Sequence, residues 1–129
     1  MVSLMHAASE KPAIDPQSLD ELRALSGEAG EDLLPRIIQM FLEDAPQALA
    51  DLRGALALAD ARAVAHLAHT VKGSGAYFGA YQFQELCNAM ETAAKAGDLA
   101  PVADLLTSTA QELQRVTAAL ATELATHSA

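Results

Sequence analysis

The sequence predicts an all-α protein: an antiparallel up-and-down four-helix bundle with a short additional N-terminal helix. Ala and Leu dominate, aromatic residues make up 4% of the chain and Trp is absent, which favours close-packed helices over strands. Apolar residues recur every three or four positions through most of the chain, the period of one helix face. The connections between these segments are short, so neighbouring helices are expected to run antiparallel.

The first expected element is a short helix that follows an N-terminal tail. Residues 1–14 show no periodicity, so we expect a flexible tail there and a bundle domain over residues 15–126. Asp15 is suited to cap the short helix, and Pro16 fits its first turn. The helix is expected to end at Gly27.

The second expected element is a long amphipathic helix that begins near Glu31. Its apolar residues form one stripe: Leu34, Ile37, Ile38, Phe41, Ala45, Leu49, Leu52 and Leu56. Pro46 lies inside this pattern and is expected to kink the helix, because proline removes a backbone hydrogen bond and clashes with the preceding turn.

Three further helices complete the expected bundle. Asp60 is suited to cap a helix that continues to about Phe78, where Gly79 provides a stop signal. The next helix ends at Gly97, and the last one begins near Asp98. The expected core residues of these last two helices are Phe83, Leu86, Cys87, Met90, Ala94, Leu106, Leu113, Val116, Leu120 and Leu124.

Composition and charge argue against several classes of protein. A formal net charge of -9 disfavours nucleic acid, because binding to phosphate backbones depends on clustered Lys and Arg. Cys87 is the single cysteine, which excludes an internal disulfide and favours a reducing compartment. No run approaches the roughly 18 apolar residues of a membrane span, and the N-terminus lacks the features of a signal peptide. We therefore expect a cytoplasmic protein without membrane contact.

The stretch HLAHTVKGSGAYFG, residues 66–79, places glycines behind a lysine and could suggest a phosphate-binding loop. In the pattern GxxxxGK[ST] the lysine follows the second glycine, whereas Lys72 precedes Gly73, and Gly79 is one position too late for GxGxxG. Both patterns also follow a strand, whereas the preceding VAHLAHTV has helical period. We therefore interpret the stretch as part of a helix.

On this helix His69 lies away from the core. At about 100° per residue the core stripe contains Val64, Leu67, Ala68, Val71, Gly75 and Phe78. His69 lies about 150° from the middle of the stripe and is expected to point to solvent. Gly73, one turn further on, leaves the imidazole open, and Lys72 places a cation near it. Gly75 on the stripe would allow close helix contact, and Ser74 could hydrogen bond to the preceding turn.

An exposed histidine beside a lysine is suited to accept a phosphoryl group. Near pH 7 a neutral imidazole has one nitrogen free to attack phosphorus while the other is held by a hydrogen bond. Lys72 would offset the negative charge of the transferred oxygens. A solvated surface histidine is the simpler interpretation of His69 alone, but its neighbours, together with Gly79 and Ala80, favour the functional one.

The segment HTVKGSGAYFGA, residues 69–80, resembles the HTxKGSxxxxGA signature of histidine-containing phosphotransfer (HPt) domains. These domains carry phosphoryl groups between receiver domains in multistep phosphorelays. Weaker similarity extends over roughly residues 15–125, including FLEDAP before the histidine and ELCNAME after it. The resemblance implies that His69 is the phosphoacceptor, that Lys72 stabilises the phosphoryl group and that Gly73 gives access to the ring.

The resemblance also implies which side chain supports the ring from the following helix. Family members often place a glutamine or glutamate against the active imidazole, and the matching residue here is Glu91. Ser74, on the helix of the histidine itself, is a second candidate for a supporting residue because its hydroxyl could donate a hydrogen bond locally. A carboxylate could orient the ring through its N–H group, but its charge could equally oppose a nearby phosphoryl group. Both effects of Glu91 remain open at this point.

Partners follow from the same resemblance. They would be response-regulator receiver domains and a hybrid sensor histidine kinase, and Mg²⁺ and the phosphorylatable aspartate would belong to the receiver. The chain would then need no cofactor of its own and would be a phosphotransfer intermediate rather than an enzyme. The kinase pattern of HE followed by arginine and proline is absent, so ATP binding is not expected. The length and the initial methionine favour a free-standing carrier.

The exposed side around His69 is the expected docking surface for receivers. Arg62, His66 and Ala76 share this side, and Ala65 lies at its margin, which suggests a small transient contact made by a monomer. His66 and His69 could also suggest a metal pair, but only acidic residues at unrelated positions could complete it, so no metal site is expected. The alternative function is a non-catalytic interaction module that binds a receiver or kinase without accepting phosphate.

Overall fold

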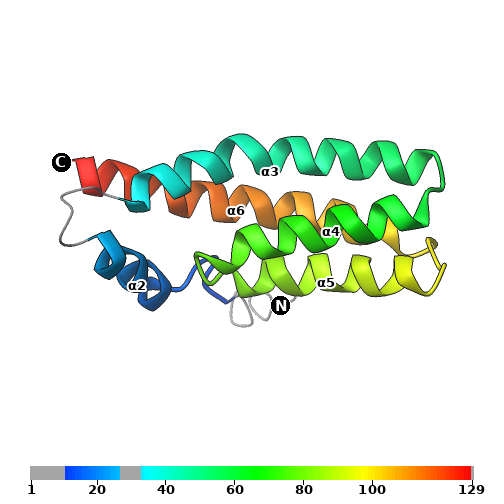
Figure 1. Cartoon of the computed structure of the whole chain (residues 1–129), viewed down its shortest axis with the longest axis horizontal. Helices are drawn as coiled ribbons and strands as arrows, with labels where there is room; N and C mark the ends of the chain where they lie inside the picture. The colour runs from blue at the N-terminus through cyan, green and yellow to red at the C-terminus, as the bar shows by residue number, and fades with distance from the viewer. Residues whose placement is uncertain (1–10, 27–32, 129) are drawn as a thin grey trace, which may run out of the picture.

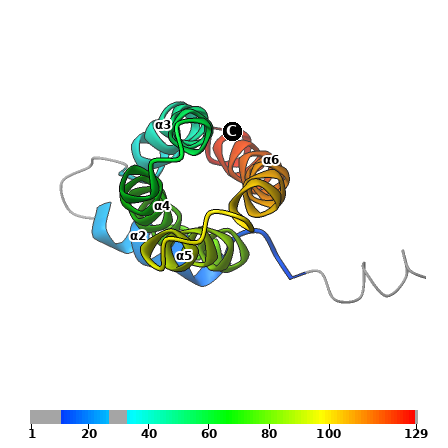
Figure 2. The ribbon, with the colours of Figure 1, turned by 90° about the vertical axis from the view of Figure 1, so that its right-hand side faces the viewer.

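The computed structural model describes residues 11–26 and 33–128, and within these ranges it contains five α-helices and no strand. The helices are α2 (Pro16–Ser26), α3 (Leu33–Ala57), α4 (Ala61–Ala76), α5 (Tyr81–Lys95) and α6 (Val102–Ser128). Helices α3 to α6 run up and down as an antiparallel bundle, and α2 packs against α3 at one end of it (Figure 1). Viewed from the end, the four long helices surround one core, with α4 diagonally across from α6 (Figure 2). The predicted fold class is confirmed.

The helix ends follow the predicted capping residues. The Asp15 carboxylate accepts a hydrogen bond from the backbone N–H of Gln17 at 3.0 Å, and Asp60 accepts one from Ala63 at 3.1 Å. These contacts satisfy N–H groups that have no partner inside the helix. Gly79, at a φ of 61°, follows the end of α4 in the left-handed conformation that glycine adopts readily. The predicted boundaries at Gly27 and Glu31 lie outside the described residues.

Two predicted boundaries are wrong. The last helix begins at Val102 rather than near Asp98, because the Asp98 side chain accepts from Ala100 N–H in a turn that precedes the helix. The predicted tail extends too far at residue 14, since Ile14 is only 9% exposed and belongs to the core. Ile14 and the partly buried Ala13 precede the periodic segment, so their burial leaves no helical pattern in the sequence. Residues 1–10 lie outside the described part of the chain.

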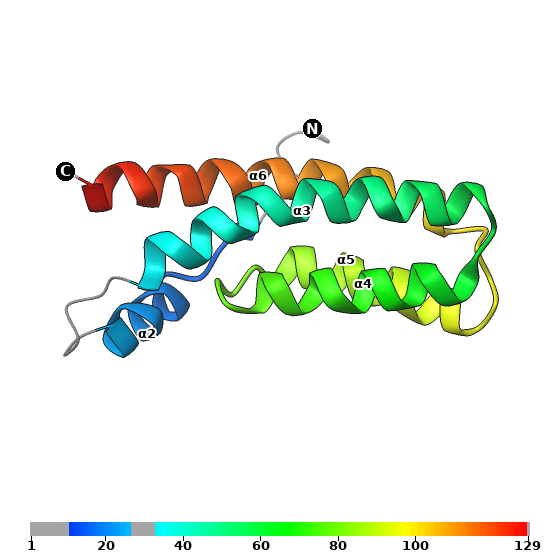
Figure 3. The same cartoon turned by 45° about the horizontal axis from the view of Figure 1, so that its top comes forward.

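The core of α3 matches the predicted stripe. Its buried residues are Leu34, Ile38, Phe41, Ala45, Leu49, Leu52 and Ala55, with Ile37 and Leu56 partly buried beside them. The helix continues through Pro46, and Figure 3 shows its first part inclined to the rest, as expected for a helix that contains proline. Phe41 contacts Phe78 and Phe83 edge to face, at centroid distances of 5.3 and 5.9 Å. These rings fix α3 against the α4–α5 pair.

The two central helices of the site approach each other closely at Gly75. A Cβ atom added there would lie 2.9 Å from Cδ2 of Phe83, closer than real side chains pack. Glycine therefore allows Phe83 of α5 to pack against the backbone of α4. None of the described helices combines the length and the apolar character needed to cross a membrane.

Candidate functional site

His69 lies in the middle of α4 on its outer side. Its side chain is 66% exposed, whereas Ala68 and Val71, its neighbours on the helix, are buried. The predicted core stripe is confirmed, with Leu67 only partly buried. His69 is exposed because it lies on the side of α4 opposite to this stripe.

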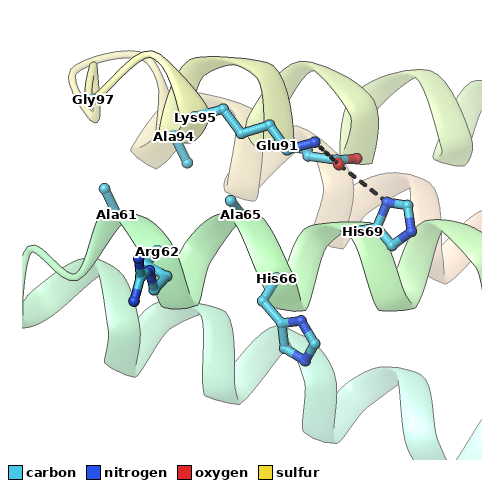
Figure 4. A pocket seen from close by; sticks show the side chains of 9 residues that line it. All are labelled: Ala61, Arg62, Ala65, His66, His69, Glu91, Ala94, Lys95 and Gly97. Atoms are coloured by element: carbon cyan, nitrogen blue, oxygen red, sulfur yellow. Dashed lines mark hydrogen bonds and ion pairs between the residues drawn. The ribbon is translucent and has the colours of Figure 1, made fainter.

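Glu91 connects His69 to two lysines. The residue comes from α5, and its side chain is only 6% exposed. Its Oε2 lies 3.0 Å from Nδ1 of His69, as Figure 4 shows, and 2.8 Å from Nζ of Lys95. Its Oε1 lies 2.8 Å from Nζ of Lys72, which also donates to Oδ1 of Asn88 at 3.1 Å. One carboxylate thus holds an imidazole and two ammonium groups.

The charge state of Glu91 fixes the tautomer of the neutral ring. Burial by itself would raise the pKa of this carboxyl, but hydrogen bonds from Lys72 and then Lys95 outweigh it and lower the pKa to about 2. An ionised carboxylate can only accept hydrogen bonds, so Nδ1 of His69 carries the proton. Nε2 of a neutral ring then has a free lone pair. In Figure 4 this second nitrogen points away from α5.

The glycines and Ser74 occupy different surroundings. A Cβ atom added to Gly73 would meet nothing within 4 Å, so the space one turn beyond His69 is open. Gly75 instead faces the core against Phe83. Ser74 does not join the ring's hydrogen bonds, because its hydroxyl donates to the carbonyl of Thr70 at 3.4 Å on its own helix. Glu91 is therefore the supporting residue that the structure brings to His69.

A groove of about 660 Å³ runs along α4 and α5 beside the histidine. It is lined by Ala61, Arg62, Ala65, His66, His69, Glu91, Ala94, Lys95 and Gly97 (Figure 4). Three of the four predicted docking residues thus line the same groove as the histidine. The fourth, Ala76, is exposed at the last residue of α4 and does not line the groove.

Comparison with known proteins assigns the chain to a family. The family model for the Hpt domain matches residues 36–123, which include the whole of α4 and α5. The chain belongs to the Hpt domain family. Members of this family are phosphocarriers in two-component relays rather than catalysts, and they interact with receiver domains and histidine kinases.

A solved structure resembles this Hpt domain along most of its length. It is the crystal structure of histidine-containing phosphotransfer protein B (HptB) from Pseudomonas aeruginosa PAO1, with a TM-score of 0.80 and 27% sequence identity. The match covers 88% of this chain and 96% of the HptB chain. No curated protein matches the chain. The similarity therefore extends beyond the signature around His69 to the arrangement of the helices.

Two residues of the cluster around His69, Lys95 and Asn88, were not predicted from the sequence. Lys95 had a usable signal, because a glutamate followed by a lysine four residues later is a favourable helical pair. Asn88 had none, since its contact with Lys72 depends on how α4 and α5 are aligned. In residues 11–26 and 33–128, no group of three or more His, Cys, Asp or Glu side chains could hold a metal ion.

Proposed function

We propose that this Hpt domain accepts a phosphoryl group from a receiver aspartate onto Nε2 of His69 and passes it to another receiver domain. The observation that carries the proposal is the shared hydrogen bond of 3.0 Å between Nδ1 of His69 and Oε2 of Glu91. It leaves the attacking nitrogen on an exposed ring while the other nitrogen is held by an ionised carboxylate.

The transfer step balances without an added acid or base. The lone pair of Nε2 attacks phosphorus, the bond between phosphorus and the receiver's aspartyl oxygen breaks, and the aspartate leaves as a carboxylate. The proton stays on Nδ1, so the product is a phosphoimidazolium ring whose positive charge is shared with the nitrogen facing Glu91. Return of the group to a second receiver aspartate is the reverse of this step.

Glu91 supports the transfer because its own charge is neutralised. The carboxylate orients the ring and stabilises the positive charge that develops on it, while ammonium groups lie 2.8 Å from each of its oxygens. Lys72 also lies one turn from the ring on α4, where its ammonium group can meet oxygens of the incoming phosphoryl group. Open space at Gly73 allows the donor to approach.

The remaining chemistry belongs to the partner. The receiver supplies the aspartate and Mg²⁺, and this chain needs no ATP site or metal of its own. We propose that receivers, including one in a hybrid sensor histidine kinase, dock on the exposed side of α4 formed by Arg62, Ala65, His66 and Ala76. Two cationic or titratable groups and two small alanines suit an acidic partner with a flat apolar patch.

A two-step relay distinguishes a carrier from a protein that only binds receivers. A receiver domain with radiolabelled phosphate on its aspartate is mixed with the Hpt domain, the labelled Hpt domain is purified, and a second unlabelled receiver is added. A carrier takes up the label in the first step and gives it up in the second. A non-catalytic interaction module would bind the receiver in a pull-down without becoming labelled, and that result would replace the proposal.

A further inference from the structure

Lys95 shares one carboxylate oxygen with the proposed phosphoacceptor. Oε2 of Glu91 lies 2.8 Å from Nζ of Lys95 and 3.0 Å from Nδ1 of His69. A carboxylate oxygen can accept from two donors at once, so both contacts can exist together. The other oxygen is occupied by Lys72. The direction in which Glu91 presents Oε2 to the ring therefore depends on both lysines.

The position of Lys95 restricts what its ammonium group can do. It lies on α5, one turn after Glu91, and Figure 4 shows its side chain extending along α5 to the carboxylate. This side of the ring carries Nδ1, whereas Nε2 points away from α5. In this arrangement Lys95 contacts the partner of the ring and not the nitrogen that attacks phosphorus. Any effect of Lys95 on the chemistry passes through Glu91.

The contact between Lys95 and Glu91 changes the net charge beside the ring of His69. Glu91 by itself would bring a negative charge to the ring and oppose the phosphoryl group. Glu91 and Lys72 together have no net charge. With Lys95 the three side chains carry a net positive charge. The second ion pair also holds the carboxylate in one orientation, with one oxygen directed at each lysine.

We propose that Lys95 is a positioning residue for phosphoryl transfer: through Glu91 it holds the ring of His69 in the Nδ1–H form and offsets the charge beside the phosphoryl group. This inference rests on the proposed function of His69. It concerns a residue that the HTVKGSGAYFGA segment does not contain, and it explains how a glutamate can serve at a position so close to a phosphoryl group.

A double-mutant cycle tests whether Lys95 acts through Glu91. Rates of label uptake from a phosphorylated receiver domain are measured for Lys95→Met in the wild-type and Glu91→Gln backgrounds. We expect Lys95→Met to slow uptake about fivefold in the wild type and to have no further effect beside Gln, because an amide carries no charge to neutralise. Lys95→Arg should restore uptake, since a guanidinium can also bind the carboxylate.

The matched control is Arg62→Met, which removes the same charge from the same groove. Arg62 lines the groove with Lys95 but belongs to α4, so its loss should slow uptake by the same factor in both backgrounds. The proposal is wrong if Lys95→Met also slows uptake by the same factor in both backgrounds, or if it leaves uptake unchanged in the wild type. Either result would show that Lys95 does not act through Glu91.

A second measurement does not depend on transfer. The ¹⁵N resonances of the His69 ring report which nitrogen carries the proton, and they can be followed in the folded single variant Lys95→Met. We expect separate protonated Nδ1 and unprotonated Nε2 signals in the wild type and closer signals in the variant, as the ring loses its fixed tautomer. Unchanged ring signals would overturn the proposal even if His69 were phosphorylated. Conversely, failure of His69 to accept label would refute the proposed function without affecting this readout.

Discussion

Glu91 shows at the residue scale how local partners reverse the effect of burial. Its side chain is 6% exposed, which would ordinarily favour the protonated form, yet the pKa is lowered to about 2 because Lys72 and Lys95 donate to it. The ordinary pKa of the group is 4.5. A carboxyl whose pKa is lower in the folded state stabilises the fold above its unfolded pKa and loses that contribution as the pH falls.

The pH dependence of stability should therefore contain a contribution from Glu91. Between pH 4.5 and about 2 we expect the free energy of unfolding of the wild type to fall by on the order of 2 kcal/mol more than that of Glu91→Gln. The exposed Lys95 makes this contribution smaller than the full shift implies. Urea unfolding at a series of pH values measures the difference, and parallel curves for the two proteins would contradict it.

Two glycines of one helix should respond in opposite ways to alanine. Gly73→Ala adds a methyl group in open space and should stabilise the protein by about 0.5–1 kcal/mol, the helix preference of alanine over glycine. Gly75→Ala places Cβ 2.9 Å from Phe83 and should destabilise it by about 1–3 kcal/mol. Thermal unfolding followed by circular dichroism separates the two. A similar change in Tm for both variants would mean that α4 and α5 are not packed as described.

At the scale of elements, Gly79 joins the end of α4 to the short helix α2. The backbone N–H of Asp15 donates to the carbonyl of Phe78 at 2.9 Å, and Tyr81 donates from its hydroxyl to the Asp15 carboxylate at 2.9 Å. A Cβ atom on Gly79 would lie 2.5 Å from Cβ of Asp15 and 2.6 Å from Oγ of Ser18. The glycine near the end of the signature thus provides both a left-handed turn and room for α2.

Gly79→Ala should therefore cost more stability than the same change at Gly97. Both glycines have positive φ, 61° and 74°, but nothing lies within 4 Å of a Cβ atom at Gly97. We expect a loss of about 1–2 kcal/mol for Gly97→Ala from the backbone alone. Gly79→Ala should lose about 1–3 kcal/mol more as α2 is displaced. Urea unfolding gives both values, and equal losses would show that α2 does not pack tightly against Gly79.

The sequence predicted where the helices lie along the chain better than it predicted which residues of different helices are in contact. Asp15, Asp60 and Gly79 carry local signals that act within a few residues, so the ends they set were predictable. The exposure of His69 followed from the angle between it and the apolar stripe. Ile14 was missed because its burial depends on contacts with distant residues.

The site itself was predicted only in part. The segment from residue 69 to 80 named the histidine, the lysine and the glycines, but the contacts between α4 and α5 join residues 16 to 22 positions apart. Such contacts depend on the axial alignment of α4 against α5, which hydrophobic periodicity does not fix. The same limit explains why the sequence left open whether Glu91 helps or hinders transfer. The structure adds the two ammonium groups at 2.8 Å from its oxygens, on which the proposal that it helps is based.

On the scale of the whole molecule, three of the eight Lys and Arg residues lie on the two helices that form the site around His69. The chain carries a formal charge of -9 with only 8 Lys and Arg residues, yet Arg62, Lys72 and Lys95 all lie near His69 on α4 and α5. The Arg62 guanidinium, which lines the groove beside His69, can direct an acidic partner to the histidine, whereas the two ammonium groups are engaged by Glu91.

A bulky charge on this side should disturb transfer more than one on the opposite side of the bundle. Ala76 shares the outer side of α4 with His69, and Gln114 is exposed on α6, diagonally across the bundle (Figure 2). We expect Ala76→Arg to raise the half-saturating concentration of phosphorylated receiver about tenfold and Gln114→Arg to change it less than about twofold. Single-turnover uptake at several receiver concentrations measures both. Equal effects would place the docking surface elsewhere.

Transfer of phosphate to His69 is tested most directly by label uptake from a phosphorylated receiver domain into the wild type, His69→Gln and His66→Gln. We expect label that is lost in acid and stable in alkali, present in the wild type and His66→Gln and absent from His69→Gln. His66 provides the matched control because it is exposed on the same helix one turn away. Label that persists in a folded His69→Gln variant would show that another residue accepts the phosphoryl group.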